Sequence, residues 1–546
     1  MKESRDILSL FEALNSHEVF TPPRVARQML DLLPTEIWSD PSIKILDPCT
    51  KSGVFLRESF YRLFTSLDGK GLYETENGEI YDLDDKKQRI NHILKNMLFG
   101  IATSELTGYV ARRTLYGVMR ANSDKQISSL DAFMHSSNYH QWTEEEKSNF
   151  IGRNKFNEYF DHNLFCTPEY EGFEQEGNIF YPNNEVKKLV MEEDDYEIED
   201  KYFPFIEENT KHKKILDIRG GVMKFDVVIG NPPYQKSDGG KTGATPLYHN
   251  FVEASMGLNP RYLCMIIPSR WFAGGRGLDK FRSAMMNDEQ ISKIVDFPKS
   301  RECFPGVDIA GGICYFLWEK GRKGSCEFTS VIDGKFTVKD RSLSEFDVII
   351  RDNISIGIIN KIKSISNENM SSTVLKVSPF GLRSFVRGES AATKNSVTVI
   401  SSGGVGYIPK DSICKNKDLI DEYKVVIGYL NPDRAGVNNS SDGKSNVTTK
   451  VRVINPGEVV TETYIIPYTS SDPVLANNAA EYIKTKFCRF LILQTLSSMH
   501  ITQSNFNFVP MQDFSTKVND EMLYKKYNLS QEEIDYIESK IKPMGV

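Results

Sequence analysis

The sequence lacks several features that define common protein classes. It contains no apolar run long enough to cross a bilayer, and no apolar signal-peptide stretch follows its charged first residues. Its eight cysteines form no C-x-x-C pair, so the spacing typical of a zinc site is missing and we predict no metal centre. In a chain of 546 residues these cysteines are expected to be reduced, mostly buried thiols. These absences favour a cytoplasmic protein that does not contact membranes.

The chain also lacks a net positive charge, since its formal charge is −7. The charge is unevenly distributed along the chain. Residues 142–210 carry 19 Asp and Glu against 6 Lys and Arg, a net charge of −13, so the rest of the chain carries a net charge of +6. Residues 376–455 carry 12 Lys and Arg against 7 Asp and Glu. A basic C-terminal region beside a segregated acidic segment is compatible with phosphate contact, although a solvated charged surface explains it equally well.

The order of apolar segments predicts a doubly wound, Rossmann-like α/β domain. Residues 43–46 form a predicted strand that ends at Asp47-Pro48, and a turn at Gly53 leads into a helical pattern. A strand, a turn and a helix in this order open such a sheet. Further short apolar segments are predicted strands: 97–101, 225–230, 262–267, 294–297 and 312–317.

Two regions depart from this alternation. Residues from about 120 to 215 are acidic, rich in aromatics and poorly periodic, so we interpret them as a segment inserted in the first domain. After about residue 330 the pattern changes to short strands and turns, and helices return from Ala479. We therefore expect two domains, an α/β domain over residues 1–330 and a mixed α+β domain with C-terminal helices over 331–546.

The tetrapeptide Asn231-Pro232-Pro233-Tyr234 follows a predicted strand and suits a specific chemistry. The Asn231 side-chain oxygen and the Pro232 carbonyl can each accept one hydrogen of an amino group, such as adenine N6, whose lone pair is delocalised into the ring. Two acceptors draw that amine toward a tetrahedral geometry, and the prolines keep the acceptors preorganised. Tyr234 offers a π-face to a base flipped out of a duplex. The tetrapeptide therefore predicts methyl transfer to an amino nitrogen by in-line displacement.

The turn from Asp47 to Gly53 is the second candidate site. A glycine in a turn after the first strand lets the backbone approach a ligand, and the next helix offers free N–H groups to a negative charge. The methionine carboxylate of S-adenosylmethionine carries such a charge. Asp-Pro turns are common, so this segment alone is compatible with an ordinary turn.

In this order the motifs resemble a known family. Phe20-Thr21-Pro22-Pro23, the 47–53 turn, the 231–234 tetrapeptide and a variable C-terminal region are similar to the gamma class of N6-adenine DNA methyltransferases, in particular to restriction–modification methylases. Residues 1–330 would then be the methyltransferase domain and 331–546 the target-recognition domain. Further segments support the resemblance: 267–272, 303–307 and 508–527.

The resemblance implies roles for individual residues. Phe304 stands where the family places an aromatic residue that packs against the flipped adenine, opposite Tyr234. Residues of the first two motifs would bind the cofactor S-adenosylmethionine: Phe20, Thr21, Pro22, Asp47, Pro48 and Gly53.

The sequence departs from the family pattern at three places. Lys51 replaces the first glycine of the usual D-P-x-x-G-S-G motif, which puts a cation near the cofactor. Ala102 stands where an acidic residue should hold the ribose hydroxyls, so we assign that role to Glu105, the nearest carboxylate. Asn178 is the candidate residue for a hydrogen bond to the adenine amine of the cofactor, and Asp131 is the alternative.

The tetrapeptide also occurs in enzymes that methylate RNA or protein glutamine. The basic C-terminal region, with its Ser- and Asn-rich turns, suits the recognition of base edges, so double-stranded DNA with a specific short site is the favoured substrate.

A non-catalytic DNA-binding subunit is an alternative, against which the intact tetrapeptide argues. A nuclease on the same chain is another, but no P-D-x(n)-(D/E)-x-K cluster precedes residue 15. A cognate restriction endonuclease would be a further partner. Candidate phosphate contacts are Lys410, Lys415, Lys417, Arg434, Lys444 and Lys450.

Overall fold

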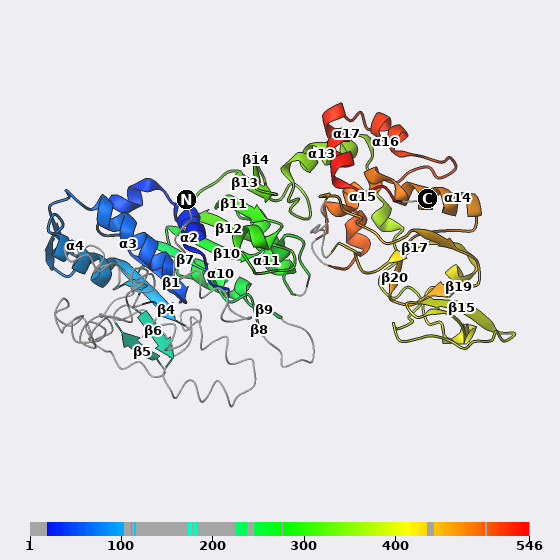
Figure 1. Ribbon diagram of the computed structural model, residues 1–546, viewed down its shortest axis with the longest axis horizontal. Helices are drawn as coiled ribbons and strands as arrows, with labels where there is room; N and C mark the ends of the chain where they lie inside the picture. The colour runs from blue at the N-terminus through cyan, green and yellow to red at the C-terminus, as the bar shows by residue number, and fades with distance from the viewer. Residues whose placement is uncertain are drawn as a thin grey trace, which may run out of the picture.

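The computed structural model describes most of the chain outside one long central stretch. Its described parts are residues 19–102, 111, 114–115, 173–176, 179–182, 224–236, 245–275, 277–433, 442–496 and 499–544. Glu105, Asp131, Asn178 and Arg434 lie outside these parts, and their roles stay predictions. In Figure 1 the blue-to-green half of the chain surrounds one large sheet, and the yellow-to-red half forms a second lobe. None of the described helices is long and apolar enough to cross a bilayer.

The first lobe is built on a ten-stranded sheet in the order β14-β13-β11-β12-β10-β7-β1-β4-β6-β5. Its central strands run parallel, and β12 lies antiparallel to both β10 and β11. This order confirms the expected doubly wound α/β fold, with three reversed strands, namely β12 and the two edge strands β14 and β5. The central strands, in chain order, are β1 (Ile45–Thr50), β4 (Leu98–Ala102), β6 (Ile179–Pro182), β7 (Val227–Gly230), β10 (Tyr262–Pro268), β11 (Ile291–Phe297) and β12 (Ile313–Glu319).

Helices cover both faces of the central part of this sheet, which is why central strands such as β7 and β10 are continuously apolar. Along β10, Cys264 and Ile266 belong to one core cluster, whereas Leu263, Met265 and Ile267 belong to the other. The first cluster includes α2 (Pro23–Leu30) and α3 (Val54–Ser66), and the second includes α10 (Tyr248–Gly257) and α11 (Asp279–Asn287). Shorter elements complete the lobe: β2 (Leu72–Glu74), β3 (Ile80–Asp82), α4 (Lys86–His92), β8 (Gln235–Lys236), β9 (Thr245–Pro246) and α12 (Ser300–Cys303).

Both edges of the sheet extend beyond the limits expected from the sequence. At one edge β13 (Cys326–Ile332) and β14 (Lys335–Arg341) carry the sheet past residue 330. At the other, β6 and β5 (Phe173–Glu176) come from within the expected insertion, so part of that stretch belongs to the sheet itself. α13 (Asn353–Ile365) then leads into the second lobe, and the Asn353 amide donates to the carbonyls of Phe328 and Thr337.

The second lobe combines two small sheets with a group of helices. One sheet has the order β16-β15-β19 and the other β18-β17-β20. The strands are β15 (Ser396–Ser401), β16 (Gly404–Pro409), β17 (Tyr423–Gly428), β18 (Arg452–Ile454), β19 (Glu458–Val460) and β20 (Tyr464–Ser470). The helices are α14 (Pro473–Lys484), α15 (Lys486–Leu493), α16 (Asp520–Lys526) and α17 (Gln531–Lys540).

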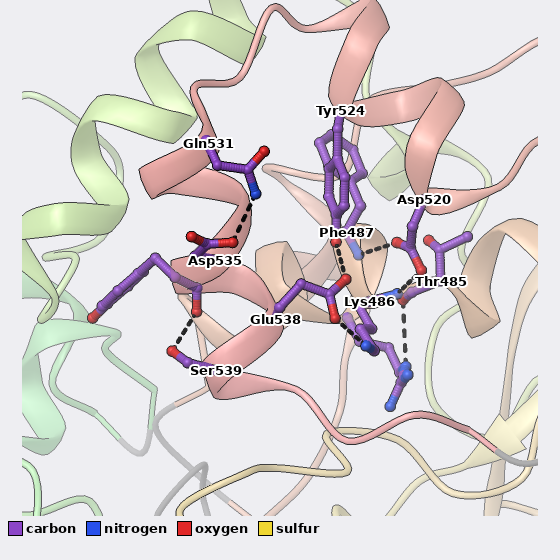
Figure 2. Close-up of polar contacts among 11 residues, drawn as sticks. Thr485, Lys486, Phe487, Asp520, Tyr524, Gln531, Asp535, Glu538 and Ser539 are labelled. Carbon is purple, nitrogen blue, oxygen red and sulfur yellow. Dashed lines mark hydrogen bonds and ion pairs between the residues drawn. The ribbon is translucent and has the colours of Figure 1, made fainter.

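Polar contacts join the last three helices where their ends meet (Figure 2). The Asp520 carboxylate accepts the backbone N–H groups of Lys486 at 3.1 Å and Phe487 at 2.8 Å, at the start of α15. A carboxylate at this position favours the helix because it satisfies free N–H groups at the positive end of the dipole. Glu538 of α17 pairs with the Lys486 ammonium and accepts the Tyr524 hydroxyl at 2.9 Å.

Candidate active site

Asn231 lies at the carboxyl end of β7, a central strand, and its side chain has a defined orientation. The residue is 3% exposed, and Nδ2 donates to the Val19 carbonyl at 2.9 Å and to the Thr21 hydroxyl oxygen at 3.0 Å. A carbonyl can only accept, so the atom that faces Val19 must be the amide nitrogen. The residues just before α2 therefore fix which way the Asn231 oxygen points.

The Asn231 Oδ1 atom is buried and has no hydrogen-bond partner among the described residues. Buried polar atoms are nearly always satisfied, because an unpaired acceptor loses its hydration without replacement. An unsatisfied acceptor held in one orientation is a preformed site for a donor such as an amino group. The companion acceptor expected from the sequence, the Pro232 carbonyl, belongs to a buried residue of the same loop.

Tyr234 anchors the end of the 231–234 loop. Its ring is half-buried and packs against both core clusters, and its backbone carbonyl accepts the Leu247 N–H at 3.1 Å. Burial raises the pKa of the Tyr234 phenol well above 10, so the hydroxyl is neutral at physiological pH. Pro233, like Tyr234, is half-buried.

Phe304, the expected second stacking residue, is 1% exposed and belongs to the core cluster against which Tyr234 packs. The ring presents no open face to solvent here, and its stacking role stays a prediction. The segment before it is fastened to α2, because the Arg24 guanidinium donates to the carbonyls of Glu302 at 2.9 Å and Cys303 at 2.8 Å.

The candidate cofactor turn begins inside β1, which continues to Thr50. Asp47 is 2% exposed, and its Oδ1 accepts the Cys49 N–H at 3.1 Å. Burial raises the pKa of this carboxyl from 3.8 to about 7, partly opposed by that hydrogen bond and by the Lys51 charge. A Cβ on Gly230 would lie 3.0 Å from Asp47 Oδ1, so the glycine lets β7 approach β1 just before Asn231.

Gly53 ends this turn and is the N-cap residue of α3. Its φ of +74° is a left-handed conformation, and an added Cβ would lie 2.9 Å from the Ala111 backbone. Both the conformation and the contact require glycine. Lys51, two residues earlier, is only 6% exposed, and its ammonium donates to the Val19 carbonyl at 3.2 Å.

The structure thus brings two predicted site residues, Thr21 and Asn231, together beside Val19, with Lys51 and Asp47 close to them. Thr21 and Asn231 are bonded, Lys51 reaches the same carbonyl as Asn231, and Asp47 lies against the strand end that leads to Asn231. Of the other cofactor candidates, Pro22 and Pro48 are buried and Phe20 is half-buried. Their contacts with a cofactor stay predictions.

Sequence reasoning missed Val19 and Arg24. Val19 acts through its backbone carbonyl, so its side-chain type carries no signal. Arg24 binds two carbonyls of a segment 278 and 279 residues away, which only the folded chain brings near.

Most of the candidate phosphate contacts lie on the surface of the second lobe. Lys410, Lys415, Lys417 and Lys450 are exposed, whereas Lys444 is half-buried. Lys410 forms an exposed pair with Asp421 at 3.4 Å, and such pairs are weak enough to rearrange when a phosphate approaches. Exposure leaves these side chains accessible to nucleic acid, and their contact with DNA stays a prediction.

Among solved structures, the chain is similar to the type I restriction-modification system methyltransferase subunit from Streptococcus thermophilus, at 12% identity and a TM-score of 0.30. That match covers 62% of this chain and 54% of that chain, so the chain spans about half the length of the subunit. It is also similar to the type IIL restriction-modification enzyme MmeI in complex with DNA, at 9% identity and a TM-score of 0.42, over 95% of this chain and 73% of that chain. The fold assignment rests on the strand order described above.

Residues 96–304 match the model of the Eco57I restriction-modification methylase family. The chain is also 34% identical over 376 residues to an "Uncharacterized adenine-specific methylase" of Mycoplasma pneumoniae (strain ATCC 29342 / M129 / Subtype 1). This match covers 66% of the chain and 80% of the relative. The chain therefore belongs to the adenine-specific DNA methyltransferases of the restriction–modification type.

Proposed function

We propose that this protein transfers a methyl group from S-adenosylmethionine to adenine N6 in double-stranded DNA, at one short sequence, after the base is flipped out of the helix. The observation that carries the proposal is the oriented amide of Asn231. Its nitrogen is held by Val19 and Thr21, and its buried oxygen has no partner among the described residues. An adenine N6 amine supplies the donor that this oxygen lacks.

The chain's own residues would activate the amine by holding it. Asn231 Oδ1 accepts one N6 hydrogen and the Pro232 carbonyl accepts the other, so the nitrogen lone pair leaves conjugation with the ring and points at the methyl group. Because the amide is fixed before the substrate arrives, little reorganisation is needed during the reaction. The proton released by N6 after transfer needs no strong base, since a methylated adeninium amine is acidic.

The residues near Asn231 fit S-adenosylmethionine, which when bound supplies an electrophilic methyl group on a sulfonium. The cofactor carries a carboxylate, an ammonium group and a sulfonium, so it suits a site with charges of both signs. Asp47 provides a buried carboxyl and Lys51 a buried ammonium next to the catalytic loop. The expected contacts of Phe20, Thr21 and Gly53 belong to the same proposal.

Base flipping follows from the burial of the acceptor. Asn231 is 3% exposed, so a base that remains stacked within a duplex cannot reach its oxygen. Enzymes that modify a base atom solve this problem by extruding the nucleotide into the site. Tyr234 would then stack on the extruded ring. The second lobe would supply the sequence recognition, and a cognate restriction endonuclease would act on unmethylated sites.

The experiment is long-read methylome sequencing of DNA from cells that express the wild-type protein or the Asn231→Ala variant. We expect N6-methyladenine in one motif with the wild type and none with the variant. An Asn287→Ala variant, altered at an exposed residue of α11 in the first lobe, serves as the matched control and should keep the pattern. Calorimetric binding of S-adenosylhomocysteine by Asn231→Ala separates loss of chemistry from loss of folding. Methylation that persists in Asn231→Ala, or its absence with both proteins, would contradict the proposal.

A further inference from the structure

An exposed aromatic side chain of the second lobe stands between two arginines. Phe385 is 74% exposed and is the middle residue of the segment 383–387, whose first and last residues, Arg383 and Arg387, are also exposed. Val405, near the tip of the β15–β16 hairpin, is 69% exposed. Two large apolar side chains left in water within one small region indicate a surface that contacts a partner.

The 383–387 segment is held against the hairpin of β15 and β16. Two residues after Arg387, Glu389 exchanges backbone hydrogen bonds with Tyr407 of β16 at 2.8 and 2.9 Å. A Cβ on Gly403, in the hairpin turn, would lie 2.5 Å from Arg387 Nε, so the glycine lets the arginine side chain lie on the turn. The segment and the hairpin tip therefore form one continuous surface.

The positions of both arginines are fixed by hydrogen bonds and an ion pair. Glu462, between β19 and β20, accepts the Ser384 N–H at 2.9 Å and pairs with Arg383 at 3.3 Å. The Arg387 guanidinium donates to two backbone carbonyls of its own segment. The backbone on both sides of Phe385 is thus ordered by contacts within the lobe. A surface ordered in this way loses little conformational entropy when a partner binds.

The surroundings of Phe385 are basic, which identifies the chemistry of the partner. Residues 376–417 carry seven Lys and Arg against two Asp and Glu, and all seven cations are exposed. Duplex DNA fits such a surface, because cations contact its phosphates and an apolar side chain can reach its bases. Figure 1 shows β15 at the end of the second lobe opposite α16 and α17, so the surface is separate from the C-terminal helices.

We propose that the 383–387 segment enters a groove of the target DNA, with Phe385 against the bases and Arg383 and Arg387 on phosphates at either side. This inference rests on the proposed function, which makes double-stranded DNA the substrate, and it names the residues of the second lobe that contact the recognition site. A phenyl ring forms no conventional hydrogen bonds, so Phe385 would discriminate through thymine methyl groups or through base steps that unstack easily.

The test measures DNA binding by fluorescence anisotropy with two labelled duplexes. One carries the motif that methylome sequencing identifies, and the other has the same composition in scrambled order. Phe385→Ala should weaken binding of the motif duplex about tenfold and of the scrambled duplex less than about twofold, because the base contact forms only in the specific complex. Arg383→Gln and Arg387→Gln should weaken both duplexes alike, and each should lower the slope of log affinity against log salt by about 1.

Matched controls alter the same kinds of side chain on the opposite end of the lobe. Met522→Ala and Lys525→Gln change an exposed apolar residue and an exposed cation of α16, and neither should affect either duplex. Circular dichroism melting curves check that every variant is folded. The affinity for S-adenosylhomocysteine should stay the same in every variant, because its proposed site lies in the first lobe.

Each outcome supports or overturns the inference. If Phe385→Ala leaves the affinity for the motif duplex unchanged, or weakens both duplexes equally, the base contact is overturned, while methylation by the wild type leaves the proposed function standing. If neither arginine variant changes the salt slope, the phosphate contacts are overturned. If the wild type binds neither duplex and methylates no DNA, both proposals fail, and the basic surface would instead suit an acidic protein partner.

Discussion

Replacing Asp47 by asparagine should stabilise the ligand-free first lobe at neutral and alkaline pH. Burial raises the pKa of this carboxyl from 3.8 to about 7. A carboxyl whose pKa rises on folding stabilises the folded state while it is protonated, and this contribution is lost as the pH climbs from about 4 through 7. Asparagine keeps an oxygen for the Cys49 N–H bond but has no proton to lose. The advantage of the variant should therefore grow with pH and level off above about 7.

The size of this change in stability follows from the raised pKa of Asp47. One pKa unit corresponds to about 1.4 kcal/mol, and about 1.5 units separate pH 5.5 from the raised pKa. The free energy of unfolding of Asp47→Asn, relative to the wild type, should thus rise by about 2 kcal/mol between pH 5.5 and pH 8. Solvent screening reduces this figure little, because Asp47 is 2% exposed.

Tryptophan fluorescence in urea is the appropriate assay, because no tryptophan follows Trp318 in the sequence and the second lobe therefore contains none. Trp38, Trp271 and Trp318 are buried and will change environment on unfolding. Asp31→Asn is the control, since it removes an exposed carboxylate that pairs with Arg62.

An advantage of Asp47→Asn that is equal at pH 5.5 and pH 8 would refute the reasoning, because it would mean that this carboxyl does not titrate in that range. The same ionisation should affect the binding of the cofactor. Because S-adenosylmethionine has a net positive charge, the affinity of the wild-type protein for it should rise with pH up to about 7, by at most roughly tenfold per pH unit. The Asp47→Asn variant should bind S-adenosylmethionine more weakly, with an affinity that does not change with pH.

Three further predictions test other contacts. Arg351→Ala leaves the fully buried Asp296 carboxylate without the guanidinium that bonds both its oxygens at 2.7 Å, so the unfolding free energy from urea titration should fall by about 3–5 kcal/mol. Thr21→Val removes one of the two acceptors that orient Asn231, so single-turnover methylation should slow about tenfold, and S-adenosylhomocysteine affinity should fall with it because Thr21 is also an expected cofactor contact. Phe385 is 74% exposed, so Phe385→Ala should change the free energy of unfolding by less than about 0.5 kcal/mol. Weaker DNA binding by this variant in fluorescence anisotropy would therefore identify a direct contact of Phe385 with DNA.

Much of the fold could be predicted because buried parallel strands appear in the sequence as short, continuous apolar segments. The segment predicted at 262–267 is β10, Tyr262–Pro268, and the one at 312–317 overlaps β12, Ile313–Glu319. The edges could not be predicted in the same way. β14 has alternating exposed residues, including Phe336 and Val338, so it carries no apolar run, and β6 lies in a stretch whose acidic composition hides a short strand.

The candidate site was predictable as far as side chains define it. Asn231 and Asp47 follow strands that the apolar pattern finds, and Gly53 stands at a turn that needs a left-handed residue. The rest depends on distance across the fold. The Val19 carbonyl is 212 residues from Asn231, and neither its acceptor role nor the burial of Lys51 follows from residue type.

The short segment from Val19 to Arg24 is the physical link among three parts of the site. Val19 accepts from both Lys51 and Asn231, Thr21 accepts from Asn231, and Arg24 donates to the backbone that precedes Phe304. A displacement of this segment would therefore disturb the cofactor turn, the acceptor amide and the aromatic segment together. Cofactor affinity and the rate of methyl transfer should accordingly change together when the segment is altered, whereas a change at Asn231 alone should affect mainly the rate.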